Sequence, residues 1–474
     1  YTTMKKNIFH IVVVLFIFSF VLSGCFDESF SNDPNDRLTF STNIVKFDTI
    51  FTQRGTATLS FKVYNHAKKS LKIESVTLAD AANSGFFINV DGSKGPVIRD
   101  LEIRGKDSLY VFVEANVDPT NQNSPLLIKD SIVFVTNGIR QDVKLEAYGQ
   151  DVNVLRGEVL PDGENVFTGE KPYLVYDSLV IPASSSLALS EGTTLYFHSK
   201  ATLEVKGKID ARGTASRPVT FRGDRLDRMF ADLPYDYLPG QWGGIRIHTD
   251  SYDNRFDHVA MRGTSTGIVI DSSDVSRTKI IFSNSVIHNS SNNLVSSTES
   301  RIEAWNCQFS NASGALMSLS GGEAKFVHCT FANYFQLMDV IKSPLLVFDR
   351  YTQTEENLPL KASFENCIII GNNTLMQPLE LLNTQIYFKT CLFRVNGSDD
   401  ENFIQCIWNG DPMFVATGDN YQYDFRLASE SSAAYRAGNP EFVDENTRTD
   451  LLGNPRPEGV NPDVGAYQYM TPTE

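Results

Sequence analysis

Five cysteines in the second half of the chain are the first residues to test for chemistry, because thiols can hold metals or form disulfides. Metal sites usually place cysteines two to four residues apart. Four of these cysteines instead follow one another at 22, 38 and 24 residues: Cys307, Cys329, Cys367 and Cys391. Five is also an odd number for a disulfide framework. We therefore expect buried free thiols, with no metal and no cofactor.

A second concentration of reactive side chains is the stretch from residue 222 to residue 242. Tyrosine and tryptophan offer flat contact area and arginine offers a bidentate fork, so the stretch suits recognition of a glycan or a protein. The alternative is a loop that folds over the domain and pairs its charges internally. The candidate binding residues are Arg222, Asp224, Arg225, Asp227, Arg228, Tyr235, Asp236, Tyr237 and Trp242.

Catalytic groups are harder to find. A lyase would need several acidic residues around calcium, and a glycosidase needs two carboxylates about 5 to 10 Å apart. Glu303 and Glu323 fall near each other in the repeat described below, but Arg301 and Lys325 flank them, which favours a solvated charged edge. The sequence therefore predicts no catalytic residue.

The cysteines reveal a repeat that must position these groups. Cys307 and Cys329 each precede a residue pair ending in Phe, and the same short pattern recurs near residues 259, 285, 367 and 391. A period near 22 residues suits a coil of three short parallel strands, with one insertion at Thr352 to Asn357. Cys406 has no place in this register.

The repeat predicts columns of stacked side chains. Phenylalanine lies three residues before the Ser or Cys position in four coils, so a bend must separate the two if both face inward. Asparagine, the non-glycine residue that best tolerates left-handed backbone, fills this corner in three coils, and His258 and His328 fill it in two others. The expected asparagine ladder is Asn284, Asn306 and Asn366, and the expected inward phenylalanines are Phe282, Phe326, Phe364 and Phe388.

Residues 38–152 have a different pattern. Alternating apolar and polar residues, as in Leu109 to Val113 and Ser131 to Val135, predict half-buried strands. About seven such strands separated by turn residues suit an immunoglobulin-like β-sandwich. The segment resembles bacterial immunoglobulin-like domains related to a centrosomal and ciliary sandwich family, which act as spacers or adaptors.

The N-terminus combines Met4-Lys5-Lys6 with an apolar run from Ile11 to Leu22 and a cysteine at position 25. The run is too short to span a membrane but suits a signal peptide. It resembles a bacterial lipoprotein signal, which implies cleavage after residue 24, acylation of Cys25 and anchoring in the outer membrane. Residues 25–37 are acidic and turn-rich, so we expect a flexible tether. The acidic residues after Cys25 also resemble the signal for surface export in Bacteroidota.

Four Asp-Ser/Thr-aliphatic triplets resemble the O-glycosylation sequon of the same phylum. The alternative is that such triplets are ordinary strand starts. The candidate acceptors are Thr49, Ser108, Ser131 and Ser178.

From residue 173 to residue 470 the chain resembles right-handed parallel β-helix proteins. Thr202 to Gly213 and Gly240 to Ile245 match their opening coils, and Gly410 to Phe414 and Asp463 to Tyr467 match their closing segment. Residues 153–172 are expected to be a linker. This fold hosts lyases, glycosidases, adhesins and scaffolds, so the resemblance implies architecture rather than activity.

Length and charge complete the prediction. The chain has 474 residues and a net charge of −15, which favours several domains and argues against nucleic acid and anionic lipid as partners. We expect an all-β, lipid-anchored outer-membrane protein at the cell surface, with a sandwich spacer and a β-helix. Its expected function is non-catalytic binding or scaffolding for an outer-membrane protein complex or a polysaccharide; the alternative is a polysaccharide lyase or glycosidase.

Overall fold

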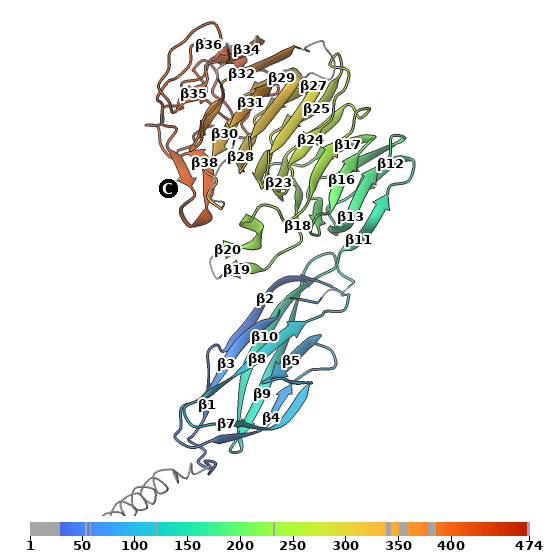
Figure 1. Cartoon of the computed structure of the whole chain (residues 1–474), viewed down its shortest axis with the longest axis vertical. Coiled ribbons are helices and arrows are strands. Elements are labelled where there is room, and N and C mark those ends of the chain that lie inside the picture. Colours follow the sequence, from blue (N-terminus) through green and yellow to red (C-terminus); the bar gives the residue numbers. More distant parts are fainter. Residues whose placement is uncertain are drawn as a thin grey trace, which may run out of the picture. The chain divides into compact units, whose positions relative to one another are not determined.

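The computed structural model describes residues 29–52, 55–56, 58–119, 121–230, 233–337, 343–349, 359–377, 379 and 385–471. It divides the chain into two compact units, one formed by Tyr1–Pro119 and Leu126–Gly149 and the other by Thr120–Pro125 and Gln150–Glu474. Both units are built from strands (Figure 1). In the described part of the chain, no helix has the length and apolarity that crossing a membrane requires.

The first unit is the expected immunoglobulin-like β-sandwich. Its two five-stranded sheets have the orders β1-β3-β8-β5-β6 and β2-β10-β9-β4-β7. Alternate residues of each strand point inward, as the period-two pattern predicts, and form one apolar core. The strands are β1 (Leu38–Phe40), β2 (Ile44–Phe51), β3 (Leu59–Asn65), β4 (Leu71–Leu78), β5 (Phe86–Val90), β6 (Ser93–Lys94), β7 (Val97–Ile103), β8 (Ser108–Ala115), β9 (Leu126–Thr136) and β10 (Ile139–Gln150).

The segment before β1 is not the free tether that its composition predicted. Phe30 forms a parallel bridge with Ser70, and the Ser31 amide donates to the Ser70 carbonyl at 2.9 Å. The Asn137 side chain also donates to the Asp33 carbonyl at 2.9 Å. Main-chain pairing thus fixes these residues to the sandwich, so the prediction of a flexible tether is wrong over this part. Residues 25–28 of the predicted tether lie outside the described residues.

The second unit is a parallel β-helix with 24 strands in one continuous sheet. Each strand pairs in parallel with the strand one coil later, so the sheet winds into three faces (Figure 1). The first face contains β11 (Asn153–Val159), β13 (Tyr173–Ile181), β15 (Thr194–Phe197), β18 (Val219–Gly223), β23 (Val259–Thr264), β26 (Val286–Ser290), β28 (Gln308–Ala312), β30 (Thr330–Asn333), β33 (Ile368–Gly371) and β35 (Leu392–Phe393).

The second and third faces share two long strands that bend from one face to the other, β27 and β29. The second face contains the ends of β11 and β13 and then β16 (Thr202–Val205), β21 (Gly244–Ile247), β24 (Ile268–Ile270), β27 (Val295–Trp305), β29 (Met317–Val327) and β31 (Leu346–Asp349). The third face contains β12 (Gly163–Phe167), β14 (Ser185–Leu189), β17 (Lys208–Arg212), β22 (Asn254–Asp257), β25 (Thr278–Ser283), β32 (Leu360–Glu365), β34 (Gln385–Lys389) and β36 (Phe403–Ile404).

The helix begins earlier than the sequence predicted. β11 pairs with β13 and β12 pairs with β14, so residues 153–172 form the first coil and are not a linker. The first coil has no earlier coil beneath it in the sheet order, and its Val154, Val159 and Val166 are exposed. Because the first coil is covered by a neighbouring coil on one side alone, its strands show a weaker apolar pattern, and that pattern is how a strand is recognised in a sequence.

The predicted inner columns are confirmed. Phe326, Phe364 and Phe388 are register partners on successive coils, and their rings stack at 4.7 and 4.8 Å. The next column runs through Phe309 and Phe331, whose rings stack at 5.2 Å. All five of these phenylalanines are fully buried, so stacked aromatic rings fill the centre of the helix.

The corner between these columns is confirmed as well. Asn284, Asn306 and Asn366 have φ values of 49°, 51° and 50°, and His258 and His328 have 50° and 51°. These left-handed residues turn the chain so that the residue after each corner also faces inward. The asparagine ladder predicted from the repeat is therefore present.

The cysteine column follows directly after the corners. Cys307, Cys329, Cys367 and Cys391 are buried and free. Cys406 continues the same column, which corrects its exclusion from the register: Gln405 before it has φ 51°, and its thiol donates to the Phe388 carbonyl. The interval from Cys391 to Cys406 is 15 residues, shorter than the expected period near 22, so the repeat did not predict the position of Cys406.

The closing segment, residues 410–471, packs on the outside of the first face. Its elements are β37 (Phe414–Thr417), η3 (Asp419–Tyr421), β38 (Tyr423–Leu427) and η4 (Pro440–Phe442). Phe425, Val464 and Tyr467 form an apolar cluster with Ile368 and Ile370 of β33. Apolar residues on both sides of β33 are thereby buried, which explains the continuous run Ile368 to Ile370.

Candidate functional site

The insertion between β18 and β21 binds back onto the first face. Asp236 accepts from Arg222 of β18 at 3.0 Å and from Arg262 of β23 at 2.8 Å. The Asn289 side chain donates to the Tyr237 carbonyl at 2.6 Å. Burial lowers the pKa of Arg222, and the charge of Asp236 opposes this change. One carboxylate thus joins two coils to the insertion.

Further contacts are internal to the insertion. Arg225 donates to Asp227 at 2.6 Å, and its guanidinium lies 3.7 Å from the ring centre of Tyr235. The Tyr235 amide donates to the Asp227 carbonyl at 3.0 Å. Charges that the sequence offered to a partner are therefore largely used to fold the insertion against the β-helix. The binding role of these residues stays a prediction.

Two candidate contact residues are not at the surface. Trp242 is 0% exposed, its ring stacks on Phe197 at 4.2 Å, and its indole N–H donates to the Arg262 carbonyl at 2.8 Å. Trp242 therefore belongs to the core, and its assignment as a contact residue is wrong. Asp224 is also buried, where it pairs with Nδ1 of His198 at 2.8 Å. Both residues were assigned from their residue types, whereas packing between coils buries them.

The exposed part of the insertion is mainly apolar. β19 (Arg228–Phe230) pairs with β20 (Leu233–Pro234), and η1 (Tyr235–Tyr237) follows. Met229, Phe230 and Tyr237 are exposed, Phe230 by 64%. Of the nine candidates, Arg228 and Tyr237 are the ones that share this exposed surface.

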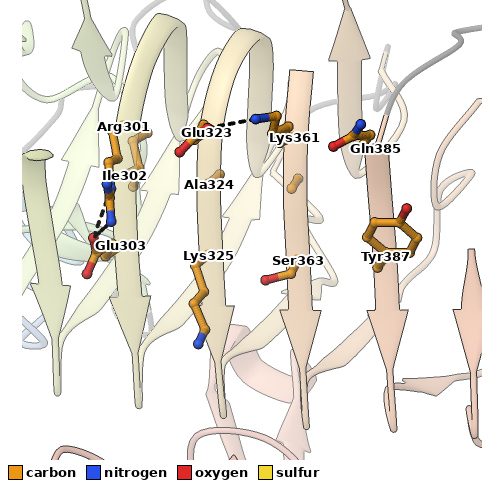
Figure 2. A pocket seen from close by; sticks show the side chains of 11 residues that line it. Arg301, Ile302, Glu303, Glu323, Ala324, Lys325, Lys361, Ser363, Gln385 and Tyr387 are labelled. Carbon is orange, nitrogen blue, oxygen red and sulfur yellow. Dashed lines mark hydrogen bonds and ion pairs between the residues drawn. The ribbon is translucent and has the colours of Figure 1, made fainter. Parts of the chain in front are cut away.

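A shallow groove of about 530 Å³ lies on the outer side of β27, β29, β32 and β34 (Figure 2). Two rows of outward side chains cross these strands, because register partners on successive coils stand side by side. The first row is Arg301, Glu323, Lys361 and Gln385, and the second row is Glu303, Lys325, Ser363 and Tyr387. These rows make a polar groove on the third face with one aromatic ring at its end.

Charges in the groove are paired. Arg301 lies 3.0 Å from Glu303 and Lys361 lies 3.2 Å from Glu323. Lys325 lines the groove between them and reaches Glu365 at 3.4 Å. The lining holds three cations and two carboxylates, and Glu365, which pairs with the third cation Lys325, lies beside it. The predicted solvated charged edge at Glu303 and Glu323 is thus one wall of a groove.

The two carboxylates stand on neighbouring coils. Glu303 faces Lys325 and Arg301 faces Glu323, so the glutamates are diagonal neighbours in the sheet. Diagonal neighbours in a sheet stand about 7 to 8 Å apart, so their carboxyl groups can reach the separations that glycosidases use. Each carboxylate is already engaged by a cation, however, and general acid catalysis needs a carboxyl group that donates a proton. The groove therefore fits binding better than hydrolysis.

A cluster of charged side chains around His248 on the second face was not predicted from the sequence. His248 Nε2 lies 2.7 Å from Glu204 and its Nδ1 lies 3.9 Å from Asp271, which also pairs with Arg246 at 3.0 Å. Lys279 is buried nearby, donates to the His248 and Thr249 carbonyls at 2.7 and 3.0 Å, and has a pKa lowered to about 8 by burial. Coil stacking alone joins these residues, so only a complete coil alignment could have found them.

Metal-binding geometry is not found in the described part of the chain, where no three His, Cys, Asp or Glu side chains gather to hold an ion. Burial raises the pKa of Cys329, Cys367 and Cys391 well above its usual value, which disfavours the thiolate that binds metals.

Comparison with known proteins adds little on function. No protein-family model and no curated protein sequence matches the chain. Among solved structures, the periplasmic chaperone SfaE is similar at 14% identity over 24% of this chain and 58% of its own, with a TM-score of 0.17. The chain thus spans less than two thirds of that chaperone.

Two further structures match different shares of the chain. The ASH/PapD-like domain 7 of human CEP192 is similar at 10% identity over 27% of this chain and 94% of its own, with a TM-score of 0.17. The catalytic unit of a GH87 α-1,3-glucanase from Streptomyces thermodiastaticus strain HF3-3 is similar at 8% identity over 74% and 88%, with a TM-score of 0.20. Such low scores carry no argument about activity.

The remaining predicted sites are the lipidation site and the four O-glycosylation candidates. Cys25 and the predicted signal peptide, residues 1–24, lie outside the described residues. Ser108 is the first residue of β8, whereas Thr49, Ser131 and Ser178 lie within β2, β9 and β13. All four side chains are partly exposed, and their glycosylation stays a prediction.

Proposed function

We propose that this protein is a lipid-anchored protein of the outer membrane, exposed at the cell surface, whose β-helix binds a polysaccharide without transforming it. The observation that carries the proposal is the polar groove on the third face, lined by Arg301, Lys325 and Tyr387 among others. The sandwich acts as a spacer between the anchor and the β-helix.

The groove has the properties that a sugar polymer needs. Its polar side chains recur on successive coils at about 4.8 Å, so a chain molecule can meet similar donors and acceptors along its length. Tyr387 is 37% exposed and offers a ring on which a sugar can stack. A protein interface would be favoured by a flat apolar patch, and the paired charges of this groove argue against one.

Binding can be tested with a panel of neutral and acidic polysaccharides in affinity electrophoresis and calorimetry. We expect at least one polymer to bind, and the double variant Tyr387→Ala, Lys361→Ala to weaken that binding at least tenfold. Tyr148→Ala is the control, because Tyr148 is also an exposed tyrosine, at 46% against 37% for Tyr387, but lies on the sandwich. Equal binding by wild type and the double variant would exclude the groove as the site.

A second candidate function is polysaccharide hydrolysis, and the presence of two carboxylates in one groove is the observation that favours it. Hydrolysis would release reducing ends, and Glu303→Gln and Glu323→Gln would each abolish the release. We expect wild type to bind a polymer without shortening it. Chelator-sensitive cleavage would instead indicate a calcium-dependent lyase.

The membrane anchor rests on the sequence around Cys25 and has its own test. Cys25→Ser should leave the protein without acyl groups, so it should leave the outer-membrane fraction. Mass spectrometry of the N-terminal peptide checks acylation, and protease treatment of intact cells checks exposure. An unmodified Cys25 in a membrane-bound wild-type protein would exclude this anchor.

A further inference from the structure

The β-sandwich has an open strand edge beside an apolar cavity. β5 pairs with β8 along its full length, but β6 on the other side covers only its last two residues through Asn89↔Lys94 and Val90↔Ser93. Phe86 and Phe87, in the first half of β5, therefore have a strand neighbour on one side only. Edges of this kind are templates for another strand.

Alternation along β5 determines which main-chain groups point outward. The Gly85 carbonyl accepts from the Asn116 amide, and the Asp91 amide donates to the Tyr110 carbonyl. The main-chain N–H and C=O groups of odd-numbered residues therefore point toward β8. The main-chain N–H and C=O groups of Phe86 and Ile88 point away from β8. The Ile88 carbonyl accepts from the Gly95 amide at 3.3 Å. Among the residues that the structure describes, none pairs with the Phe86 amide and carbonyl or with the Ile88 amide.

A cavity of about 670 Å³ adjoins this edge. Apolar groups of Leu78, Phe86, Ile88 and Pro96 line it, and Ala81 lies at its wall. Phe87 is 56% exposed and belongs to the same lining. Main-chain groups without a protein partner beside a largely apolar cavity suit an occupant that supplies both apolar contact and hydrogen bonds.

The lining holds one cation, Lys94, and one carboxylate, Glu114. The Glu114 carboxylate accepts from the Thr58 hydroxyl at 2.8 Å and keeps its negative charge. Lys94 is exposed and forms no ion pair with any residue in the described ranges. The positive charge of Lys94 is thus available to a carboxylate on the occupant.

We infer that this edge of the sandwich binds an extended segment of a partner protein, which adds a strand to β5. The segment carries apolar side chains at alternate positions for the cavity and an acidic side chain for Lys94. Two donors and one acceptor at the spacing of a strand match a polypeptide main chain, whereas a lipid supplies no such series. This inference concerns the sandwich and is independent of the groove on the β-helix.

The test is selection from a phage-displayed library of random dodecapeptides against the full chain in detergent. We expect enriched peptides with apolar residues at alternate positions and at least one acidic residue. Ala81→Trp fills the cavity and should weaken the binding of these peptides at least tenfold. Ala82→Trp, on the same exposed loop but outside the lining, is the matched control and should bind normally.

Two further measurements separate strand addition from other contact. Hydrogen exchange of the Phe86 and Ile88 amides should slow at least tenfold with a bound peptide, because both amides gain an acceptor. Selection on Lys94→Glu should enrich basic residues in place of acidic ones. The inference is overturned if no peptide is enriched, if Ala81→Trp binds the peptides like wild type, or if the two amides exchange unchanged.

Discussion

The side-chain amide of Asn306 donates a hydrogen bond to Oδ1 of Asn284, one coil earlier, at 3.1 Å. The same amide reaches the Thr449 carbonyl at 2.8 Å, and the buried Arg456 guanidinium donates to Asn306 Oδ1 at 3.0 Å. This corner residue therefore joins two coils to each other and joins the closing segment to the coils.

Substitution at this corner should separate backbone strain from hydrogen bonding. Asn306→Gly keeps the left-handed backbone but leaves Arg456 without this acceptor, so it should destabilise the protein by about 2 to 3 kcal/mol. Asn306→Ala should cost about 1 kcal/mol more, because alanine is strained at φ 51°. Chemical denaturation of the two variants measures the difference, and equal stabilities would contradict the strain argument.

Loss of one ring from the central stack should be costly. Phe331→Ala removes a fully buried side chain that contacts Phe309, Phe326 and Phe364, so it should destabilise by roughly 3 to 5 kcal/mol. Phe87→Ala, at an exposed aromatic residue, should change stability by less than about 1 kcal/mol. Thermal and urea unfolding check both, and similar losses for the two would refute the packing assignment.

The insertion over the first face should depend on one carboxylate. Asp236→Ala leaves Arg222 and Arg262 partly buried without their shared partner, so we expect a loss of about 2 to 3 kcal/mol. Asp227→Ala breaks only the more exposed pair with Arg225 and should cost at most about 1 kcal/mol. If both cost the same, Asp236 does not hold the insertion in place.

His328 should make stability depend on pH. Burial lowers its pKa well below the usual 6.5, so below pH 6.5 the unfolded chain binds a proton that the folded chain does not. The contribution of His328 to the free energy of unfolding is fully present above pH 6.5. It falls as the pH decreases, at up to about 1.4 kcal/mol per pH unit.

His328→Asn supplies the residue that other coils use at this corner and removes the titrating group. The variant should unfold with a correspondingly smaller pH dependence between pH 6.5 and 5. His66→Asn, at an exposed position on the sandwich, is the control and should leave the dependence unchanged. An identical pH profile for His328→Asn and wild type would show that His328 is not the group responsible.

The sequence predicted features that recur on successive coils. Asn306 and Phe331 could be assigned because the same residue types return at a nearly constant interval and the register turns that interval into contact. Cys406 was missed because its coil is shorter than the others. The first coil was missed because Val154 and Val166 are exposed at the end of the stack.

The candidate sites were harder to predict because their contacts cross between distant segments. The ion pair of Asp236 with Arg262 joins residues 26 positions apart, and nothing in the local sequence of Asp236 reveals it. The groove depends on Lys361 and Tyr387, which follow irregular insertions and so have no fixed spacing from Glu323. In the sandwich, the open edge of β5 is set by the two-residue length of β6, which composition does not encode.

The buried cysteine column gives each of the last coils its own natural label. A thiol reagent cannot reach Cys329, Cys367 or Cys391 while their coils are closed, and Cys406 is the one partly exposed member of the column among the described cysteines. Because coils contact mainly their neighbours, opening can proceed along the stack one coil at a time. The order in which these thiols become alkylated under mild denaturant would then report, residue by residue, from which end the helix unwinds.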